Sequence, residues 1–228
     1  MYLGIFGIFI IVARKLIFSI DEYYHLYGRG VDKRIVFVDD YDKNRFIKLL
    51  FVSNSTKSFV YRDIQDKKLS EIEIDTKLVV IGAYCLMPNH FHILVKEISE
   101  KGISKFMGKL LTAYSSYFNK RHGRRGHLFE ENFKAEHAGE DEYLKYLFSY
   151  IHLNPIKFIQ KDWKENGIRD LKQAKKYLDN YRYSSYQDYV GVDREEKLIL
   201  TKDVFPDYFK SIIEMQKEIE GWLNFNNK

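Results

Sequence analysis

Two histidines, His90 and His92, begin an apolar run of the sequence. Residues two apart on a β-strand point to the same face, about 6.6–6.8 Å apart along the chain, so both imidazoles could converge on one metal ion. Phe91 between them would point into the core. A His-x-His pattern alone is a weak signal, and two unrelated polar strand residues are the commoner case. However, buried histidines need polar partners, and the apolar residues 93–95 favour a metal site.

Tyr150 and Asn154 are four positions apart, a spacing that puts both side chains on one face of a helix, one turn apart. The amide oxygen of Asn154 could then complete a His/His/Asn metal site, with the Tyr150 phenol beside the ion. The alternative is that Tyr150 is a core aromatic residue and Asn154 ends the helix before Pro155. Taken alone, the spacing favours this alternative.

A basic, glycine-bearing loop is expected over residues 119–127. Its four cationic side chains are Lys120, Arg121, Arg124 and Arg125. Such a cluster fits contacts with DNA phosphates, and it fits a solvated loop equally well. Arg29 and Lys134, elsewhere in the chain, are weaker candidates for DNA binding.

Hydrophobic periodicity predicts the elements that must position these residues. Apolar residues recur at helical spacing within 40–52, 103–118 and 140–153. Alternating or β-branched runs predict strands at 22–27, 78–86, 91–98 and 128–137. The order strand, helix, strand, strand, helix, strand, helix predicts an α+β fold, with a small antiparallel sheet covered by helices.

The remaining segments suggest a domain at residues 18–158, preceded by an apolar segment (1–17) and followed by a mostly helical extension (159–228). Residues 53–77 are polar and charged, so we expect an irregular or inserted segment there. The extension is expected to be loop-rich from Lys161 and helical again over 206–223. Its many tyrosines between Tyr181 and Tyr189 could stack on bases, but packing against the core is favoured.

Composition limits the class of protein. The chain has 228 residues, of which 45% are hydrophobic, enough for one sizeable core. A net charge of +5 suits a polyanionic partner without proving one. The single cysteine, Cys85, excludes an intrachain disulfide and a multi-cysteine zinc site, and it makes a reducing, cytoplasmic setting the default.

Residues 1–13 are uncharged and mostly apolar. The run is shorter than a membrane-spanning helix requires, and its basic residues Arg14 and Lys15 follow the apolar stretch, whereas a signal peptide has them before it. We predict that translation starts at Val12. The alternative is a short anchor at the membrane surface; no stable membrane partner is expected.

Taken together, the motifs resemble one family. Residues 87–95, MPNHFHILV, resemble the strand motif of the HUH transposases. Residues 150–155, YIHLNP, resemble the helix signature of the REP-associated tyrosine transposases, relatives of the single-tyrosine insertion-sequence transposases. The resemblance runs from about Phe18 to Gly191 and includes further matches at 126–129, 133–134 and 181–186. Gly28 departs from it, because a more polar residue is expected before Arg29-Gly30.

The resemblance implies a ferredoxin-like HUH domain that holds a divalent metal, Mg²⁺ or Mn²⁺. Carried over by position, His90 and His92 are metal ligands, Asn154 is the third ligand, and Tyr150 is the nucleophile. The chemistry alone leaves two rivals on the same helix, Tyr143 and Tyr146, but neither stands one turn from Asn154.

The implied function is that of a transposase which cuts and rejoins single-stranded DNA at hairpin or palindromic elements through a 5′-phosphotyrosine. It would be associated with the nucleoid and would act as a monomer or a homodimer. Two alternatives stay open. One is a DNA hairpin-binding protein that derives from such a transposase and no longer cuts. The other is a metal-dependent hydrolase that uses the histidines without a covalent step.

Overall fold

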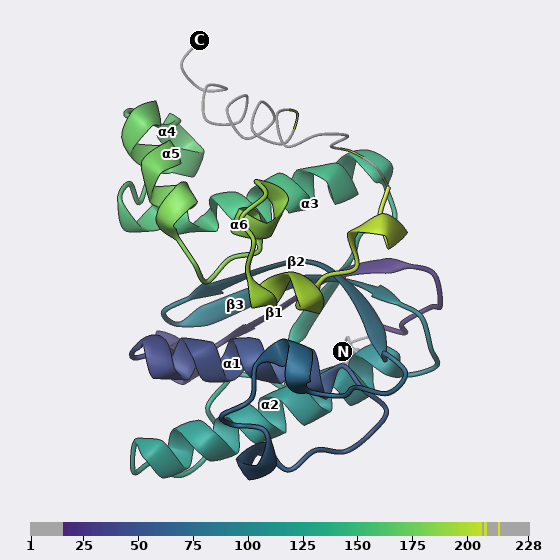
Figure 1. Cartoon of the computed structure of the whole chain (residues 1–228). Coiled ribbons are helices and arrows are strands. Elements are labelled where there is room, and N and C mark those ends of the chain that lie inside the picture. Colours follow the sequence, from purple (N-terminus) through teal and green to yellow (C-terminus); the bar gives the residue numbers. More distant parts are fainter. Residues whose placement is uncertain (1–15, 207, 209–213, 215–228) are drawn as a thin grey trace, which may run out of the picture.

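The computed structural model describes residues 16–206, 208 and 214 (Figure 1). The predictions for residues 1–15, which include the translation start and the surface anchor, lie outside this part of the chain, and so does most of the helix predicted over 206–223. Across the described ranges, no helix has the length and apolar character needed to cross a membrane.

Four strands form one antiparallel sheet in the order β2-β3-β1-β4. They are β1 (Tyr23–Arg29), β2 (Val79–Met87), β3 (His90–Glu97) and β4 (Lys134–His137). A tight turn at Pro88-Asn89 joins β2 to β3, as predicted. With α1 (Asp40–Ser53) between β1 and β2, and α2 (Gly102–Arg121) between β3 and β4, this is the βαββαβ order of a ferredoxin-like fold.

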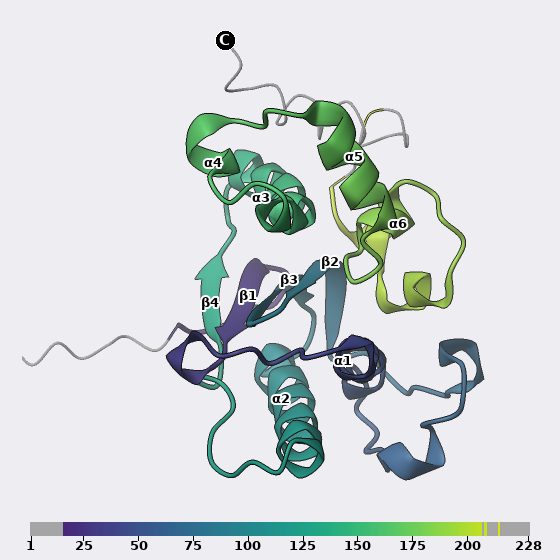
Figure 2. The same cartoon turned by 90° about the vertical axis from the view of Figure 1, so that its left-hand side faces the viewer.

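Helices cover both faces of the sheet (Figures 1 and 2). One face packs against α1 and α2. The other packs against α3 (Asp141–Leu153), with shorter helices beyond it: α4 (Trp163–Asn166), α5 (Leu171–Asn180) and α6 (Tyr186–Tyr189). Because the sheet is covered on both faces, every residue of β2 is buried. The predicted α+β fold is confirmed.

The fourth strand is shorter than predicted: continuous pairing begins at Lys134, and only an isolated antiparallel bridge joins Phe129 to Gly30 within the predicted range 128–133. Leu128 and Phe129 are buried although they lie in a loop. Phe129 meets Phe91 edge-on, with 5.6 Å between the ring centroids. The apolar residues that suggested an early strand start are therefore core contacts of the loop that enters the sheet.

Residues 53–77 are irregular, as predicted, with short 3-10 turns at Tyr61–Asp63 and Leu69–Glu71. Lysines from the helices hold this segment by its main chain. The Lys48 ammonium donates to the carbonyl oxygens of Ile64, Gln65 and Lys67. Lys109 does the same at Ser55 and Lys57.

The segment after α5 packs on the outer edge of β2. Leu86 N–H donates to the carbonyl of Tyr183 at 2.9 Å, and Ser185 N–H donates to that of Tyr84 at 3.0 Å. The Tyr189 hydroxyl donates to the carbonyl of Gly82 at 2.8 Å. The prediction that these tyrosines pack against the core is confirmed, whereas three helices between residues 163 and 189 replace the loop-rich stretch that we expected.

Candidate active site

Alternation along β3 decides which way the histidine pair faces. Phe91, Ile93 and Val95 point into the core beneath α1 and α2, while Leu94 packs on the α3 side. His90 and His92 therefore share the α3 face, with their ring centroids 5.0 Å apart. The predicted common face of the two histidines is confirmed.

Helix α3 brings Tyr150 to this pair. Leu144, Leu147 and Ile151 seat the helix on the sheet. The Tyr150 ring then stands edge-on to His92, with 5.6 Å between centroids. A cavity of about 460 Å³ opens here, and the side chains that line it include His90, His92, Tyr150 and Asn154. All four residues of the predicted reaction centre thus meet in one cavity.

Asn154 is 3% exposed at the end of α3. Its amide nitrogen donates to the main-chain oxygen of Tyr150 at 2.8 Å, so the side chain satisfies one of the unpaired carbonyls of the last helical turn. The alternative role of Asn154, ending the helix, is thereby present. It is compatible with metal binding, because the amide nitrogen makes this contact and the amide oxygen is the atom that would coordinate.

Burial raises the pKa of the Tyr150 phenol above its ordinary value. The positive charge of Lys157 and a hydrogen bond with Asn154 act in the opposite direction, and the charge of Glu136 adds to the rise. The phenol is therefore protonated at neutral pH and needs activation before it can act as a nucleophile.

The rival tyrosines differ from Tyr150 in their contacts. The Tyr143 hydroxyl donates to Glu136 at 3.1 Å, and burial together with this contact raises its pKa to about 12. Tyr146 stands between the other two rings, 6.2 Å from Tyr143 and 5.7 Å from Tyr150. Only Tyr150 has both the ring contact with His92 and the one-turn relation to Asn154.

Strand register explains why Arg29 reaches the cavity. Arg29 pairs with His90 across β1 and β3, and Tyr27 pairs with His92. Directly opposed residues of antiparallel strands share a face, so Arg29 joins the cavity wall. The departure at Gly28 also has a steric reason: a Cβ there would lie 2.7 Å from the Phe91 ring.

The other DNA-binding candidates fall into two groups. Lys134 lines the cavity and forms an ion pair with Glu131 at 3.5 Å. The residues Lys120, Arg121, Arg124 and Arg125 lie at the end of α2 and in the following loop, and are not among the residues that line the cavity. Their role in DNA binding stays a prediction.

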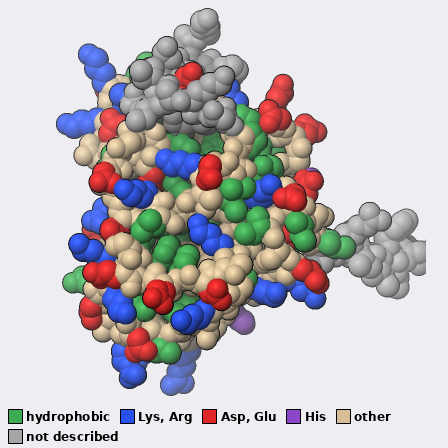
Figure 3. All heavy atoms as spheres, turned by 45° about the vertical axis from the view of Figure 1, so that its right-hand side comes forward, with side chains coloured by type: hydrophobic (Ala, Val, Ile, Leu, Met, Phe, Trp, Pro, Cys, Tyr) green, Lys and Arg blue, Asp and Glu red, His purple; other side chains and the backbone are tan. Residues whose placement is uncertain are grey.

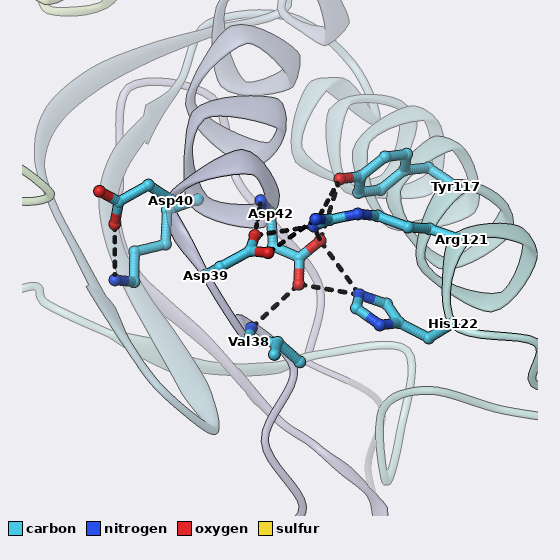
Figure 4. Close-up of polar contacts among 8 residues, drawn as sticks. Val38, Asp39, Asp40, Asp42, Tyr117, Arg121 and His122 are labelled. Atoms are coloured by element: carbon cyan, nitrogen blue, oxygen red, sulfur yellow. Dashed lines mark hydrogen bonds and ion pairs between the residues drawn. The ribbon is translucent and has the colours of Figure 1, made fainter.

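Arg121 already has acidic partners (Figure 4). Its guanidinium lies 2.6 Å from carboxylate oxygens of both Asp39 and Asp42 at the start of α1. The buried Asp42 carboxylate also accepts from the Tyr117 hydroxyl at 2.9 Å and from Val38 N–H at 2.9 Å. This network joins the end of α2 to the beginning of α1.

Three further cavity residues, His25, Glu136 and Lys157, were not singled out from the sequence. Strand alternation over residues 22–27 was the available signal for His25. Its Nε2 lies 2.9 Å from His92 Nδ1. Glu136 and Lys157 could not be recognised from the sequence, because the residues next to them in the chain form no motif that indicates a site.

Within the described residues, no group of three His, Cys, Asp or Glu side chains is arranged to hold a metal ion. The Asn154 amide oxygen is the further candidate donor beside the two imidazoles in the cavity. Nδ1 of His90 lies 2.6 Å from Asn89 Oδ1, and Nδ1 of His92 lies 2.9 Å from His25. Metal-bound histidines use their second ring nitrogen in this way, so Nε2 of each would be the atom that faces an ion, and the residues fit a divalent cation.

The family model described as transposase IS200 like matches residues 31–154, more than half of the chain. The chain belongs to this IS200-like transposase family. Membership assigns it to DNA binding and DNA transposition. The matched part of the IS200-like transposase holds the histidine pair, Tyr150 and Asn154.

A solved structure of a REP-associated tyrosine transposase bound to a REP hairpin is similar to this IS200-like transposase. The two chains share 12% identity with a TM-score of 0.44, over 84% of this chain and 92% of the other. Among curated proteins, no match was found.

Proposed function

We propose that this IS200-like transposase cuts and rejoins single-stranded DNA at hairpin or palindromic elements through a 5′-phosphotyrosine on Tyr150. The observation that carries this proposal is the shared cavity. In it, the Tyr150 ring lies 5.6 Å from that of His92, and Asn154 bonds to the main chain of Tyr150 itself. A nucleophile and three potential metal ligands thus adjoin one space that a phosphate can enter.

In the cleavage step, Tyr150 Oη forms a bond to phosphorus and the bond between phosphorus and the 3′ oxygen breaks. The phenol gives up its proton, and the departing 3′ oxygen gains one. The phosphoryl group stays on Tyr150 as a phosphodiester. A second 3′-hydroxyl can therefore reverse the step and join a new strand without ATP, because one bond is formed for each bond broken.

His90, His92 and Asn154 would hold the divalent cation, which withdraws charge from the scissile phosphate when bound. Two imidazoles with an amide suit Mn²⁺ better than Mg²⁺, although Mg²⁺ is the more abundant ion in cells. Lys157 acts on the nucleophile, Tyr150. Its positive charge favours the phenolate form of Tyr150 and so opposes the effect of burial.

Arg29, Lys134 and Lys157 supply positive charge for the DNA backbone at the cavity. Three acidic side chains line the same cavity: Glu130, Glu131 and Glu136. Their formal negative charges cancel the three positive charges. A bound cation would provide the excess positive charge that an entering phosphate needs.

Lys120, Arg121, Arg124 and Arg125 would contact DNA farther from the cleavage site. On the face shown in Figure 3, basic and acidic side chains are interspersed.

The test uses purified protein, Mn²⁺ or Mg²⁺, and labelled single-stranded oligonucleotides from the DNA that flanks the gene. We expect a covalent protein–DNA adduct on a denaturing gel that requires metal and disappears in Tyr150→Phe. Tyr146→Phe is the matched control, because it removes a neighbouring hydroxyl from the same helix face, and it should retain the adduct. Hairpin binding without an adduct under either metal would support a non-cleaving binding protein. Cleavage that persists in Tyr150→Phe would support a hydrolase.

A further inference from the structure

A second histidine, His25 of β1, lies against the proposed metal ligand His92. His25 is 4% exposed, and its Nε2 is 2.9 Å from His92 Nδ1. The two rings are nearly parallel, with an interplanar angle of 20° and centroids 5.0 Å apart. The Nδ1 atom of His92 therefore has a buried and oriented partner, which leaves Nε2 as the nitrogen that would face a cation.

The next strand continues this contact. Glu136 of β4 pairs with His25 in the strand register, and its Oε2 lies 3.9 Å from His25 Nδ1. Two hydroxyls fix the carboxylate in place: Tyr27 donates to Oε1 at 2.8 Å, and Tyr143 donates to Oε2 at 3.1 Å. A carboxylate, an imidazole and a second imidazole thus lie in a row across β4, β1 and β3.

The hydrogen-bond partners in this row determine which ring nitrogens of His92 and His25 carry protons. If His92 coordinates through Nε2, its proton is on Nδ1 and is donated to His25 Nε2. His25 must then carry its own proton on Nδ1, the nitrogen that faces the Glu136 carboxylate. The negative charge of Glu136 favours this arrangement over the opposite one, which would place the His92 proton on the coordinating nitrogen.

We propose that His25 and Glu136 are positioning residues that fix the tautomer and ring orientation of His92 for metal binding. This inference rests on the proposed function, because it assumes that His92 is a ligand. His25 acts by direct hydrogen bonding. Glu136 acts through its charge, since 3.9 Å exceeds a direct hydrogen bond, and its effect is the smaller of the two.

The first measurement is made on metal-free protein labelled with ¹⁵N-histidine. Long-range proton–nitrogen spectra report which ring nitrogen carries the proton. We expect His92 protonated on Nδ1 in the wild-type protein, and a mixture of tautomers in His25→Ala. A histidine that merely fills space would leave the tautomer of His92 unchanged. Protonation of wild-type His92 on Nε2 would overturn the proposal.

The second measurement is the affinity for Mn²⁺ in the absence of DNA, with electron paramagnetic resonance as the method of detection. Loss of such a partner typically weakens metal binding by about 10–100-fold. We expect about tenfold for His25→Ala and a smaller loss for Glu136→Gln. Glu131→Gln is the matched control. It removes an acidic residue from the same cavity wall that pairs with Lys134, and it should bind Mn²⁺ like the wild type.

Because His25 is buried, His25→Ala could fail to fold, and Glu136→Gln at the exposed end of the row then carries the test. Unchanged Mn²⁺ affinity in every folded variant would refute the positioning role. If such variants accompany a wild-type protein that forms the Tyr150 adduct, the inference fails and the proposed function stands. If the Mn²⁺ and tautomer effects appear without any adduct, the positioning role stands and the proposed function fails.

Discussion

The Asn154 amide nitrogen donates to the main-chain oxygen of Tyr150 at 2.8 Å, across the last turn of α3. One hydrogen bond thus connects the proposed nucleophile to a proposed metal ligand, and it also ends the helix. Any shift of the helix end would move both groups together. The reaction centre therefore depends on the local structure of α3 as well as on the chemistry of its side chains.

Substitution of Asn154 separates these two roles. Asn154→Asp keeps an oxygen ligand but replaces the amide donor with a buried carboxylate, so it should lose at least about 1–3 kcal/mol of stability without metal and retain Mn²⁺ binding. Asn154→Ala loses both, and its yield of covalent adduct should fall by about tenfold or more. Thermal unfolding and Mn²⁺ titration of the two variants measure the difference. Equal Mn²⁺ affinity in Asn154→Ala and the wild type would exclude Asn154 as a ligand.

Lys157 should set the pH dependence of adduct formation. Its charge lowers the pKa of the Tyr150 phenol, so Lys157→Gln should raise that pKa and move the rising limb of the pH profile to higher pH. Lys157 is exposed, hence we expect the shift to shrink in high salt. Single-turnover adduct yields between about pH 7 and 10 test this. Lys161→Gln, an exposed neighbour that does not line the cavity, should leave the profile unchanged.

Arg121 should contribute more to stability than the other basic residues near the end of α2. Arg121→Ala leaves the buried Asp42 carboxylate without its guanidinium partner and should cost about 1–3 kcal/mol, measured by urea unfolding. Arg125→Ala, in the exposed loop, should weaken binding of single-stranded DNA with no change in stability. The stability prediction is wrong if both variants unfold at the same urea concentration.

The same network should respond to acid. The Arg121 guanidinium lowers the pKa of Asp39 to about 2, below the ordinary value of 3.8. Its stabilising effect is therefore complete above about pH 4 and is lost as the pH falls towards 2. In Arg121→Ala this loss should be smaller than in the wild type. Because Asp39 is 42% exposed, the difference should be modest.

His152 should make the fold sensitive to acid at a higher pH. Burial, with the charges of Lys202 and Arg194, lowers the pKa of His152 to about 3. Between about pH 6.5 and 3 the unfolded chain binds a proton that the folded chain does not, so stability falls as the pH is lowered through this range. His152→Gln can keep a contact with Ser185, which lies 2.8 Å from His152, and removes the titration. Unfolding curves at pH 7 and 5 should therefore differ less in this variant.

Local periodicity was sufficient for the parts of the site that lie within one element. A strand repeats every two residues and a helix every 3.6, so the common face of His90 and His92 and the one-turn relation of Tyr150 and Asn154 follow from spacing alone. The element order likewise predicted a small antiparallel sheet covered by helices, and the resemblance implied its ferredoxin-like form. These features depend on neighbours in the chain, and the sequence contains them directly.

Pairing between distant segments was decided only by the tertiary structure. His25 and Glu136 meet because β1 lies between β3 and β4 in a particular register. Arg121 was expected in a basic loop over residues 119–127, but it lies in the last turn of α2, beside Asp39 and Asp42. The apolar residues Leu128 and Phe129 suggested a strand and instead fill the core from a loop. In each case the partner comes from another part of the chain, so the choice is made by burial and charge pairing in the folded protein, which local spacing does not encode.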